Sequence, residues 1–244
     1  MRQTPHAVCS AHAAPGLRSV AADHLAAAHA GFLYLLIKRL LDVSICSLAL
    51  LMLSPLLALI ALAIKLNSPG PVIFAQDRVG YDPRQRVPRP FKFYKFRSMR
   101  HNADPAIHRE HMARLIREKS APAEAGASLK LAHDPRITCV GRLLRRTSLD
   151  ELPQLINVLE GEMSLVGPRP AIPYEVANYS EWHRQRLQAL PGVTGWWQVK
   201  GRNRVSFDES VRLDIYYVEH RSLMLDLKIL LLTPWAVISG RGAG

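Results

Sequence analysis

The sequence predicts a mainly α-helical chain with a few short strands (α+β), attached to one face of a membrane as a monotopic protein. Three observations predict this class. Residues Val43 to Ile64 carry no charge, this apolar run is interrupted at Ser54-Pro55, and the later part of the chain has several patterns with the period of an amphipathic helix. The chain of 244 residues is long enough for one sizeable core with an attached segment.

The chain divides into three expected parts. Residues 1–31 are rich in alanine and histidine without a sustained apolar pattern, and we expect a disordered tail there. Residues 32–66 form the expected membrane helix. Residues 67–244 form the expected domain at the cytoplasmic face, which ends in an interfacial amphipathic helix over Leu223 to Ile238.

The apolar run of 22 residues is long enough to cross a hydrocarbon layer of about 30 Å. Pro55 removes one backbone N–H and its ring presses against the carbonyl of Leu51, so a bend or break is expected there. Lysine and arginine flank both ends of the run, and such residues mark the cytoplasmic side. We therefore expect a re-entrant helix broken at Ser54-Pro55. A single span with a tolerated proline is the open alternative.

The formal charge of +12, from 32 basic and 20 acidic residues, favours an acidic partner such as nucleic acid, anionic lipid or a phosphorylated substrate. Aromatic and basic residues interleave from Phe91 to Met99. No RNA-binding signature surrounds them, so we expect contact with phosphate or an anionic lipid bilayer and no nucleic acid. Three scattered cysteines fit neither a disulfide framework nor a zinc site, and they indicate a reducing compartment.

Two adjacent carboxylates, Asp150 and Glu151, precede an amphipathic helix. Three arginines that share one helical face lie just before them: Arg142, Arg145 and Arg146. These cations and the positive end of a helix can hold an anion beside a carboxylate, an arrangement suited to phosphoryl transfer. A structural alternative stays open, because Ser148 and Glu151 also fit a capping box.

A second candidate anion site is the loop Gly167-Pro168-Arg169-Pro170. The two prolines fix the backbone on either side of Arg169, so its guanidinium loses less entropy when it grips an anion. A turn without a ligand is the alternative. Residues 120–128 are expected to form a loop or a mobile flap.

Seven motifs appear in an order that resembles the bacterial sugar transferases, the small monotopic polyprenyl-phosphate phosphoglycosyl transferases. The resemblance covers the chain from about Tyr34 to the C-terminus. The motifs are Lys38-Arg39-Leu40-Leu41-Asp42, Ser54-Pro55, Ser68-Pro69-Gly70-Pro71, Lys95-Phe96-Arg97-Ser98-Met99, Leu149-Asp150-Glu151-Leu152-Pro153-Gln154, Gly167-Pro168-Arg169-Pro170 and Pro191-Gly192-Val193-Thr194-Gly195.

The resemblance implies a membrane enzyme at the cytoplasmic face of the bacterial inner membrane, with residues 67–244 as its catalytic domain. Such an enzyme moves a sugar 1-phosphate from a UDP-sugar to polyprenyl phosphate, usually undecaprenyl phosphate, and releases UMP. This is the first membrane step in assembling a surface glycan such as an exopolysaccharide or lipopolysaccharide. A homodimer is one option for its assembly.

The resemblance also implies residue roles. Asp150 would be the nucleophile that carries a covalent phosphosugar, and Glu151 together with Asp150 would bind Mg²⁺. Four cations would hold phosphate oxygens: Lys95, Arg97, Arg145 and Arg169. Two other functions stay open, namely a noncatalytic basic module that binds a membrane surface, and a lipid-phosphate transferase that works by single displacement.

Overall fold

The computed structural model describes residues 15–102, 106–118, 134–201 and 205–238. By its internal contacts the chain separates into two compact units, Met1–Lys38 and Arg39–Gly244. Helix α1 (Pro15–Asn67) begins in the first unit. We expected a disordered tail through residue 31, whereas the helix already begins at Pro15. Its alanine-rich stretch at residues 21–30 explains this, since alanine has the highest helix propensity. Residues 1–14 and the expected loop at 120–128 lie outside the described residues.

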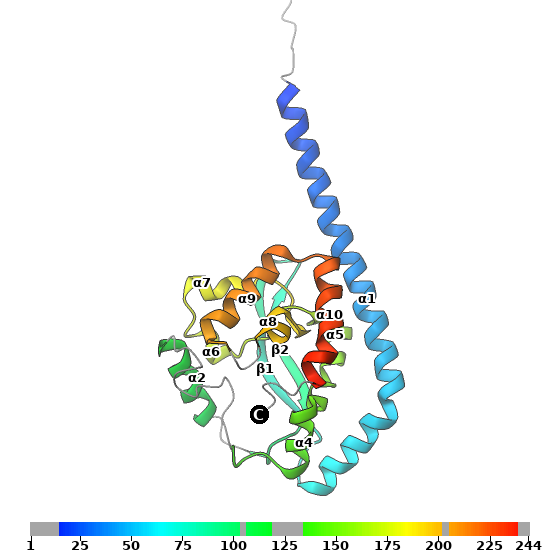
Figure 1. The fold of residues 1–244 in the computed structure, drawn as a ribbon, viewed down its shortest axis with the longest axis vertical. Coiled ribbons are helices and arrows are strands. Elements are labelled where there is room, and N and C mark those ends of the chain that lie inside the picture. The colour runs from blue at the N-terminus through cyan, green and yellow to red at the C-terminus, as the bar shows by residue number, and fades with distance from the viewer. Residues whose placement is uncertain (1–14, 103–105, 119–133, 202–204, 239–244) are drawn as a thin grey trace, which may run out of the picture. The chain divides into compact units, whose positions relative to one another are not determined.

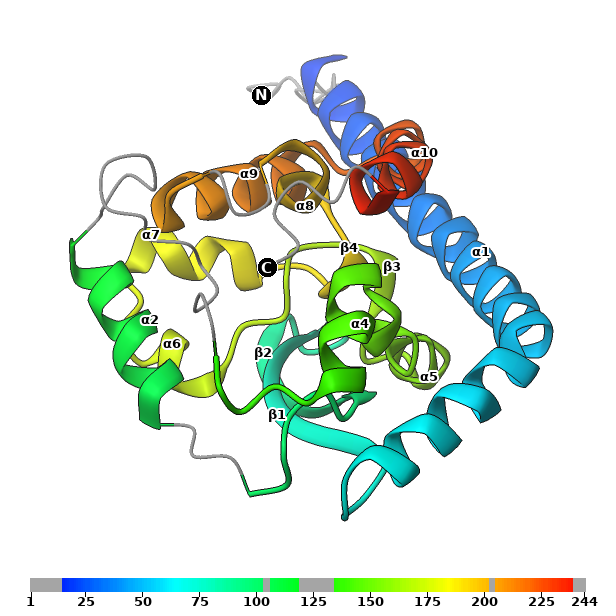
Figure 2. The same cartoon turned by 60° about the horizontal axis from the view of Figure 1, so that its bottom comes forward.

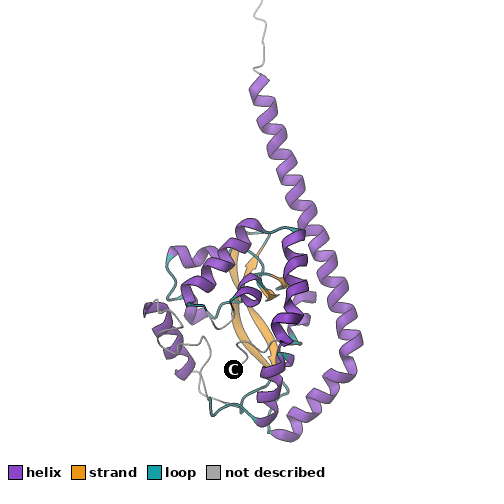
Figure 3. Ribbon diagram, viewed as in Figure 1, coloured by secondary structure: helices purple, strands orange, loops and turns teal. Residues whose placement is uncertain are grey.

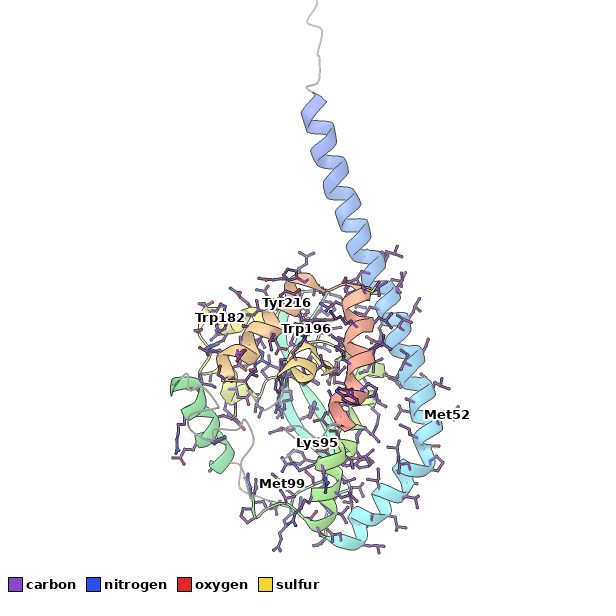
Figure 4. All side chains as sticks on the ribbon, in the orientation of Figure 1. Met52, Lys95, Met99, Trp182, Trp196 and Tyr216 are labelled. Atoms are coloured by element: carbon purple, nitrogen blue, oxygen red, sulfur yellow. The ribbon has the colours of Figure 1, made fainter. Side chains whose placement is uncertain are left out.

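Within the second unit, α1 changes direction beyond Met52 (Figures 1 and 4). Pro55 lies inside the helix and cannot donate to the carbonyl of Leu51. The hydroxyl of Ser54 donates to that carbonyl instead, at 2.8 Å. The side chain thus satisfies the acceptor that the proline leaves, which lets the helix bend without ending. The expected bend is present in one continuous helix, and the re-entrant path stays a prediction.

Residues Gly31–Asn67 of α1 are long and apolar enough to cross a membrane, and this is the one such helix among the described residues. Much of the apolar surface of α1 points away from the protein: Leu48, Leu51 and Leu59 are each exposed. An exposed apolar surface of this size is typical of contact with lipid or with another protein.

In the described parts of the chain, four strands form two small sheets (Figure 3). Strands β1 (Ile73–Asp82) and β2 (Val87–Phe96) pair antiparallel from Ile73 opposite Phe96 to Asp82 opposite Val87. Both are longer than the short strands that the sequence suggested, because each supplies the hydrogen-bonding partner of the other. Strands β3 (Ser164–Val166) and β4 (Gly192–Thr194) pair in parallel.

Helices lie on both sides of the β1–β2 hairpin (Figures 1 and 2). On one side are α2 (Ala106–Glu118), α6 (Pro173–Val176), α7 (Glu181–Arg184), the 3₁₀ turn η2 (Gln185–Leu187) and α9 (Phe207–His220). On the other are α4 (Cys139–Thr147), the 3₁₀ turn η1 (Leu149–Glu151), α5 (Gln154–Glu160) and α10 (Leu223–Ile238), with α8 (Trp196–Lys200) beside α9 and α10.

The second half of α1 is part of the core of the second unit. Cys46 is fully buried in the same cluster as Phe93, Val158 and Ile229, which come from β2, α5 and α10. The guanidinium of Arg39 donates to the carbonyls of Val158 and Leu159, the latter at 2.8 Å, and so caps the C-terminal end of α5.

A second polar contact comes one turn further along α1. The carboxylate of Asp42 accepts from the backbone N–H of Leu165 in β3 at 3.0 Å. The membrane helix and the domain therefore form one folded unit from Arg39 onward.

A helix is present where the interfacial helix was expected, namely α10, and its position at a membrane interface stays a prediction. Its inner face buries Ile229, and the carboxylate of Asp226 accepts from the hydroxyl of Tyr217 at 2.7 Å. Its outer face exposes large apolar side chains: Met224, Leu227, Leu231 and Trp235. A helix that is apolar on its exposed face fits the plane of a membrane interface.

Candidate active site

A cavity of about 260 Å³ lies where both sheets meet α5, α8 and α10. Its wall contains three cations and one carboxylate among the described residues: Arg78, Lys95, Arg169 and Glu151. The remainder of the wall is largely apolar or amide-bearing. The balance of charge favours an anionic ligand with two or more negative charges.

The carboxylate dyad lies in the 3₁₀ turn η1 rather than at the start of a helix. Ser148 adopts the left-handed conformation with φ of 58°, ends α4, and makes no side-chain capping bond to η1. The capping-box alternative is therefore wrong. Helix α5 begins only at Gln154, so Pro153 precedes it and costs no helical hydrogen bond.

The two carboxylates have different surroundings. Glu151 is exposed and lines the cavity, whereas Asp150 is only 6 % exposed and lies behind the wall. Strand β2 packs against η1, which brings Lys95 close to the dyad (Figure 4 labels Lys95). Burial lowers the pKa of Lys95 from 10.5 to about 8, and Asp150 is the neighbour that most strongly supports its positive charge.

Of the three arginines of α4, the structure brings only Arg145 towards the site. Arg142 and Arg146 are exposed, while Arg145 is half-buried and close enough to Lys95 to lower the pKa of that ammonium. Gly141 explains this placement, because an added Cβ there would overlap the carbonyl oxygen of Ser98. Helix α4 is thereby pressed against the chain that follows β2.

Arg169 lies in a loop that is braced from two sides. The N–H of Gly167 donates to the carbonyl of Thr194 at 3.0 Å, and the N–H of Gly192 donates to the carbonyl of Pro168 at 2.8 Å. A Cβ added at Gly167 would overlap the carbonyl oxygen of Leu190, so only glycine fits at this position.

The far side of the same loop is held by α9 and α8. The backbone N–H of Arg169 donates to Asp214 at 3.4 Å, and its guanidinium lies 5.8 Å from the ring centre of Trp197. The predicted stiff loop is confirmed, and Arg169 lines the cavity.

Arg97 does not line the cavity. Its Nη2 donates to the carbonyl of Ser68 at 2.6 Å, to the hydroxyl of Ser68 at 3.0 Å and to the carbonyl of Ile64 at 3.4 Å. The side chain is buried against the end of α1. This geometry gives Arg97 a part in holding the helix end and does not support the phosphate contact that we expected.

From the sequence we assigned no site role to Arg78 or Gln154, and both line the cavity. Gln154 is 2 % exposed, and its Nε2 has no hydrogen-bond acceptor among the described residues. The buried Nε1 of Trp197 likewise has none. Buried donors without acceptors are costly, so both fit a site whose ligand supplies the acceptors. The sequence feature that could have pointed to Gln154 is its position shortly after Asp150 in the chain.

The dyad suits a metal ion that is shared with a substrate. Mg²⁺ takes oxygen ligands and is commonly held by one or two carboxylates together with substrate phosphates and water. No group of three or more His, Cys, Asp or Glu side chains in the described parts of the chain could hold a metal alone. Glu151 on the wall and Asp150 behind it therefore fit Mg²⁺ only in company with a phosphorylated ligand.

These features define a membrane-associated protein with a cationic pocket beside two carboxylates. Residues 33–240 match the family model described as bacterial sugar transferase. The chain therefore belongs to the bacterial sugar transferase family.

Named relatives agree with this. The chain is 42 % identical over 211 residues to the exopolysaccharide production protein ExoY of Sinorhizobium fredii, covering 84 % of this chain and 87 % of that protein. It is 41 % identical over 216 residues to the galactosyl transferase CpsE of Streptococcus agalactiae, covering 86 % of this chain and 44 % of that protein.

It is also 42 % identical over 208 residues to the undecaprenyl-phosphate galactose phosphotransferase of Salmonella typhimurium, covering 85 % of this chain and 41 % of that protein. The chain thus spans most of ExoY and less than half of the other two relatives.

Proposed function

We propose that this protein transfers a sugar 1-phosphate from a UDP-sugar to polyprenyl phosphate, with undecaprenyl phosphate as the natural acceptor, in the assembly of an exopolysaccharide or related surface glycan. The observation that carries the proposal is the cavity whose wall holds Arg78, Lys95, Arg169 and Glu151, with the buried Asp150 next to Glu151 in the same turn. A diphosphate and a lipid phosphate both repel a carboxylate, so attack by one requires nearby cations that offset the charge. The names of the relatives support the substrate classes.

In the proposed first step, a carboxylate oxygen of Asp150 attacks the β-phosphorus of the UDP-sugar. The bond from that phosphorus to the bridging oxygen breaks, and UMP leaves with the electron pair. In the second step, an oxygen of polyprenyl phosphate attacks the same phosphorus, and the carboxylate of Asp150 leaves. Two displacements let one site serve a water-soluble donor and a membrane-bound acceptor in turn.

The charged groups near the dyad have different roles in these two steps. Lys95 interacts with both Asp150 and Arg145, and these two cations would stabilise the phosphoryl group as it moves. Arg169 is fixed by its braced loop and holds a phosphate without reorganising. Glu151, with Asp150, would hold Mg²⁺, which supplies positive charge to the phosphate oxygens when it is bound.

We also propose that the site lies at the cytoplasmic face of the inner membrane. The outer faces of α1 and α10 are both apolar, and in the core Cys46 of α1 packs in one cluster with Ile229 of α10. A re-entrant α1 places both of its basic ends on the cytoplasmic side. The cavity wall includes Thr233, Ala236 and Val237 of α10, so an acceptor held in the lipid layer would reach the cavity along this helix.

The proposal is tested with the full-length protein and a UDP-sugar labelled in its β-phosphate, without acceptor. We expect one equivalent of UMP and labelled protein, and no label with Asp150→Asn. Label that survives in Asp150→Asn but is lost in Glu151→Gln would assign the attack to Glu151. Turnover in the presence of acceptor without any trapped adduct would show single displacement. Release of no UMP from any UDP-sugar would leave only the noncatalytic membrane module.

A further inference from the structure

Arg78 is a buried cation that no proposed step has used. It lies on β1, is 5 % exposed, and its guanidinium sits 5.0 Å from the ring centre of Phe93. Its Nη1 donates to the carbonyl of Pro170 at 2.9 Å, and its Nη2 donates to the side-chain oxygen of Gln76 at 3.1 Å. Its Nε is buried and has no acceptor among the described residues.

The charge of Arg78 also has no counter-ion within salt-bridge distance among the residues described. A buried guanidinium without an anion is unfavourable, because it has lost its hydration and gained no opposite charge. Its pKa is lowered to about 10 by burial and by the neighbouring Arg169, although Glu175 partly offsets this. Arg78 and Arg169 both line this cavity, and two arginines on one wall can bind the same anion.

The register of the hairpin gives the order of these cations along the cavity. Lys95 pairs with Phe74 and Arg78 pairs with Phe91, so the two cations lie on the same face of the hairpin at separate points along the strands. Strand β2, which carries Lys95, packs against the dyad turn η1, whereas Arg78 bonds the loop of Arg169 at Pro170. The cations therefore form a row that leads away from the dyad. A phosphate attacked by Asp150 lies at the first end of this row, and a second phosphate bonded to it would lie towards Arg78 and Arg169.

We propose that Arg78 binds the donor's second phosphate, the one that leaves with the nucleoside, together with Arg169. This inference rests on the proposed function, because the phosphate that it assigns to Arg78 belongs to the diphosphate of the same donor. Arg78 has a positioning part as well, since its bond to Pro170 holds the loop of Arg169. Arg78→Lys keeps a positive charge and Arg78→Gln removes it, so comparing the two variants reports on the charge.

The test uses full-length protein in detergent and inorganic pyrophosphate as the probe, measured by calorimetry. Glutamine at position 78 carries no charge and is shorter than arginine, so it also loses the contact with the carbonyl of Pro170, whereas lysine keeps a positive charge. We expect Arg78→Gln to weaken pyrophosphate binding about 10- to 100-fold, the loss typical of a buried charge-assisted contact. Arg78→Lys should be intermediate. Arg84→Gln, at an exposed position in the turn of the same hairpin, should bind as the wild type does.

Thermal melting of each variant and labelling from the UDP-sugar separate the outcomes. Arg78→Gln that melts and binds pyrophosphate as the wild type does overturns the inference, even if the wild type is labelled on Asp150. If Arg78→Gln fails to fold, undiminished binding by Arg78→Lys overturns it instead. A wild type that binds pyrophosphate but never releases UMP would contradict the proposed function and leave the phosphate contact of Arg78 standing.

Discussion

The carboxylate of Asp214 accepts from the backbone N–H of Arg169 at 3.4 Å, and the same oxygen accepts from the guanidinium of Arg186. Asp214 is fully buried on α9, so a charge in the second unit's core holds a loop of the cavity wall. The order of the chain gives no hint of this, because 45 residues separate Arg169 from Asp214. The contact links the packing of α9 to the site.

We expect Asp214→Asn to lower the free energy of unfolding by about 3–5 kcal/mol, because it leaves Arg186 buried without its counter-ion. The folded fraction should also bind pyrophosphate more weakly, since the loop of Arg169 loses a support. Urea unfolding and calorimetry measure the two effects. Asp208→Asn is the control, because Asp208 is partly exposed and bonds His183 rather than the loop. Unchanged pyrophosphate binding by folded Asp214→Asn would show that the loop of Arg169 keeps its conformation without Asp214.

A pH dependence follows from Lys95, whose pKa is about 8 in the fold against 10.5 in the unfolded chain. Below pH 8 its ammonium is charged and can hold a phosphate, so kcat/KM for UMP release should fall as the pH rises through about 8. Lys95→Arg should remove this fall, because a guanidinium stays protonated there. A wild-type profile that stays level to pH 10 would show that the charge on Lys95 is not required.

The contribution of Lys95 to stability changes with pH in the opposite direction to its contribution to activity. Between about pH 8 and 10.5 the unfolded chain binds the proton and the folded chain does not, so this group's contribution to stability rises with pH. Below pH 8 the fold bears the cost of a charged, desolvated ammonium. Urea titrations of wild type and Lys95→Met at pH 7.5 and 9.5 should therefore differ more at the lower pH.

The bend in α1 gives a prediction for membrane topology. Pro55→Leu restores a backbone donor to the carbonyl of Leu51 and should straighten the helix. In the wild type, single cysteines at positions 19 and 65 should react with an impermeant reagent from the same side of the membrane. In Pro55→Leu, part of the population should be labelled from opposite sides. Opposite labelling already in the wild type would reject re-entry.

Arg97 gives a prediction that separates holding the fold from binding phosphate. Arg97→Met removes three hydrogen bonds at the end of α1 and should lower the free energy of unfolding by about 3 kcal/mol. Pyrophosphate binding by the folded protein should stay near the wild-type value. A weakening as large as that of Lys95→Met, with unchanged melting, would restore the original expectation of a phosphate contact.

The contrast between Lys95 and Arg97 shows what the sequence could predict. Residues two apart in a strand face the same side, and both cations follow that spacing in an aromatic and basic segment. Strand β2 ends at Phe96, so the alternation stops before Arg97, whose side chain turns to the end of α1. Local patterns predicted the bend of α1, because Ser54 and Pro55 determine it, whereas the partners that hold the loop of Arg169 are distant in the chain.

Arg78 shows what the sequence could not predict. One arginine in a strand usually faces water, and only the contact of β1 with Phe93 and with the loop at Pro170 buries it. These partners are distant in the chain, and neither has a local signature that points to Arg78. The extent of β1 and β2 was missed for the same reason, since each strand is stabilised by the other.

The bonds of Arg39 to the end of α5 and of Asp42 to β3 fix the position of the cavity relative to the second half of α1. In the membrane arrangement proposed above, they would also fix the distance of the cavity from the lipid tails. A catalytic domain joined to its membrane helix by a flexible linker could function with any membrane helix of adequate length. Here replacing α1 by an unrelated segment would remove Cys46 and its neighbours from the core. Residues 67–244 fused to another transmembrane segment should therefore not fold. We therefore expect the activity of the proposed enzyme to depend on the thickness of the bilayer.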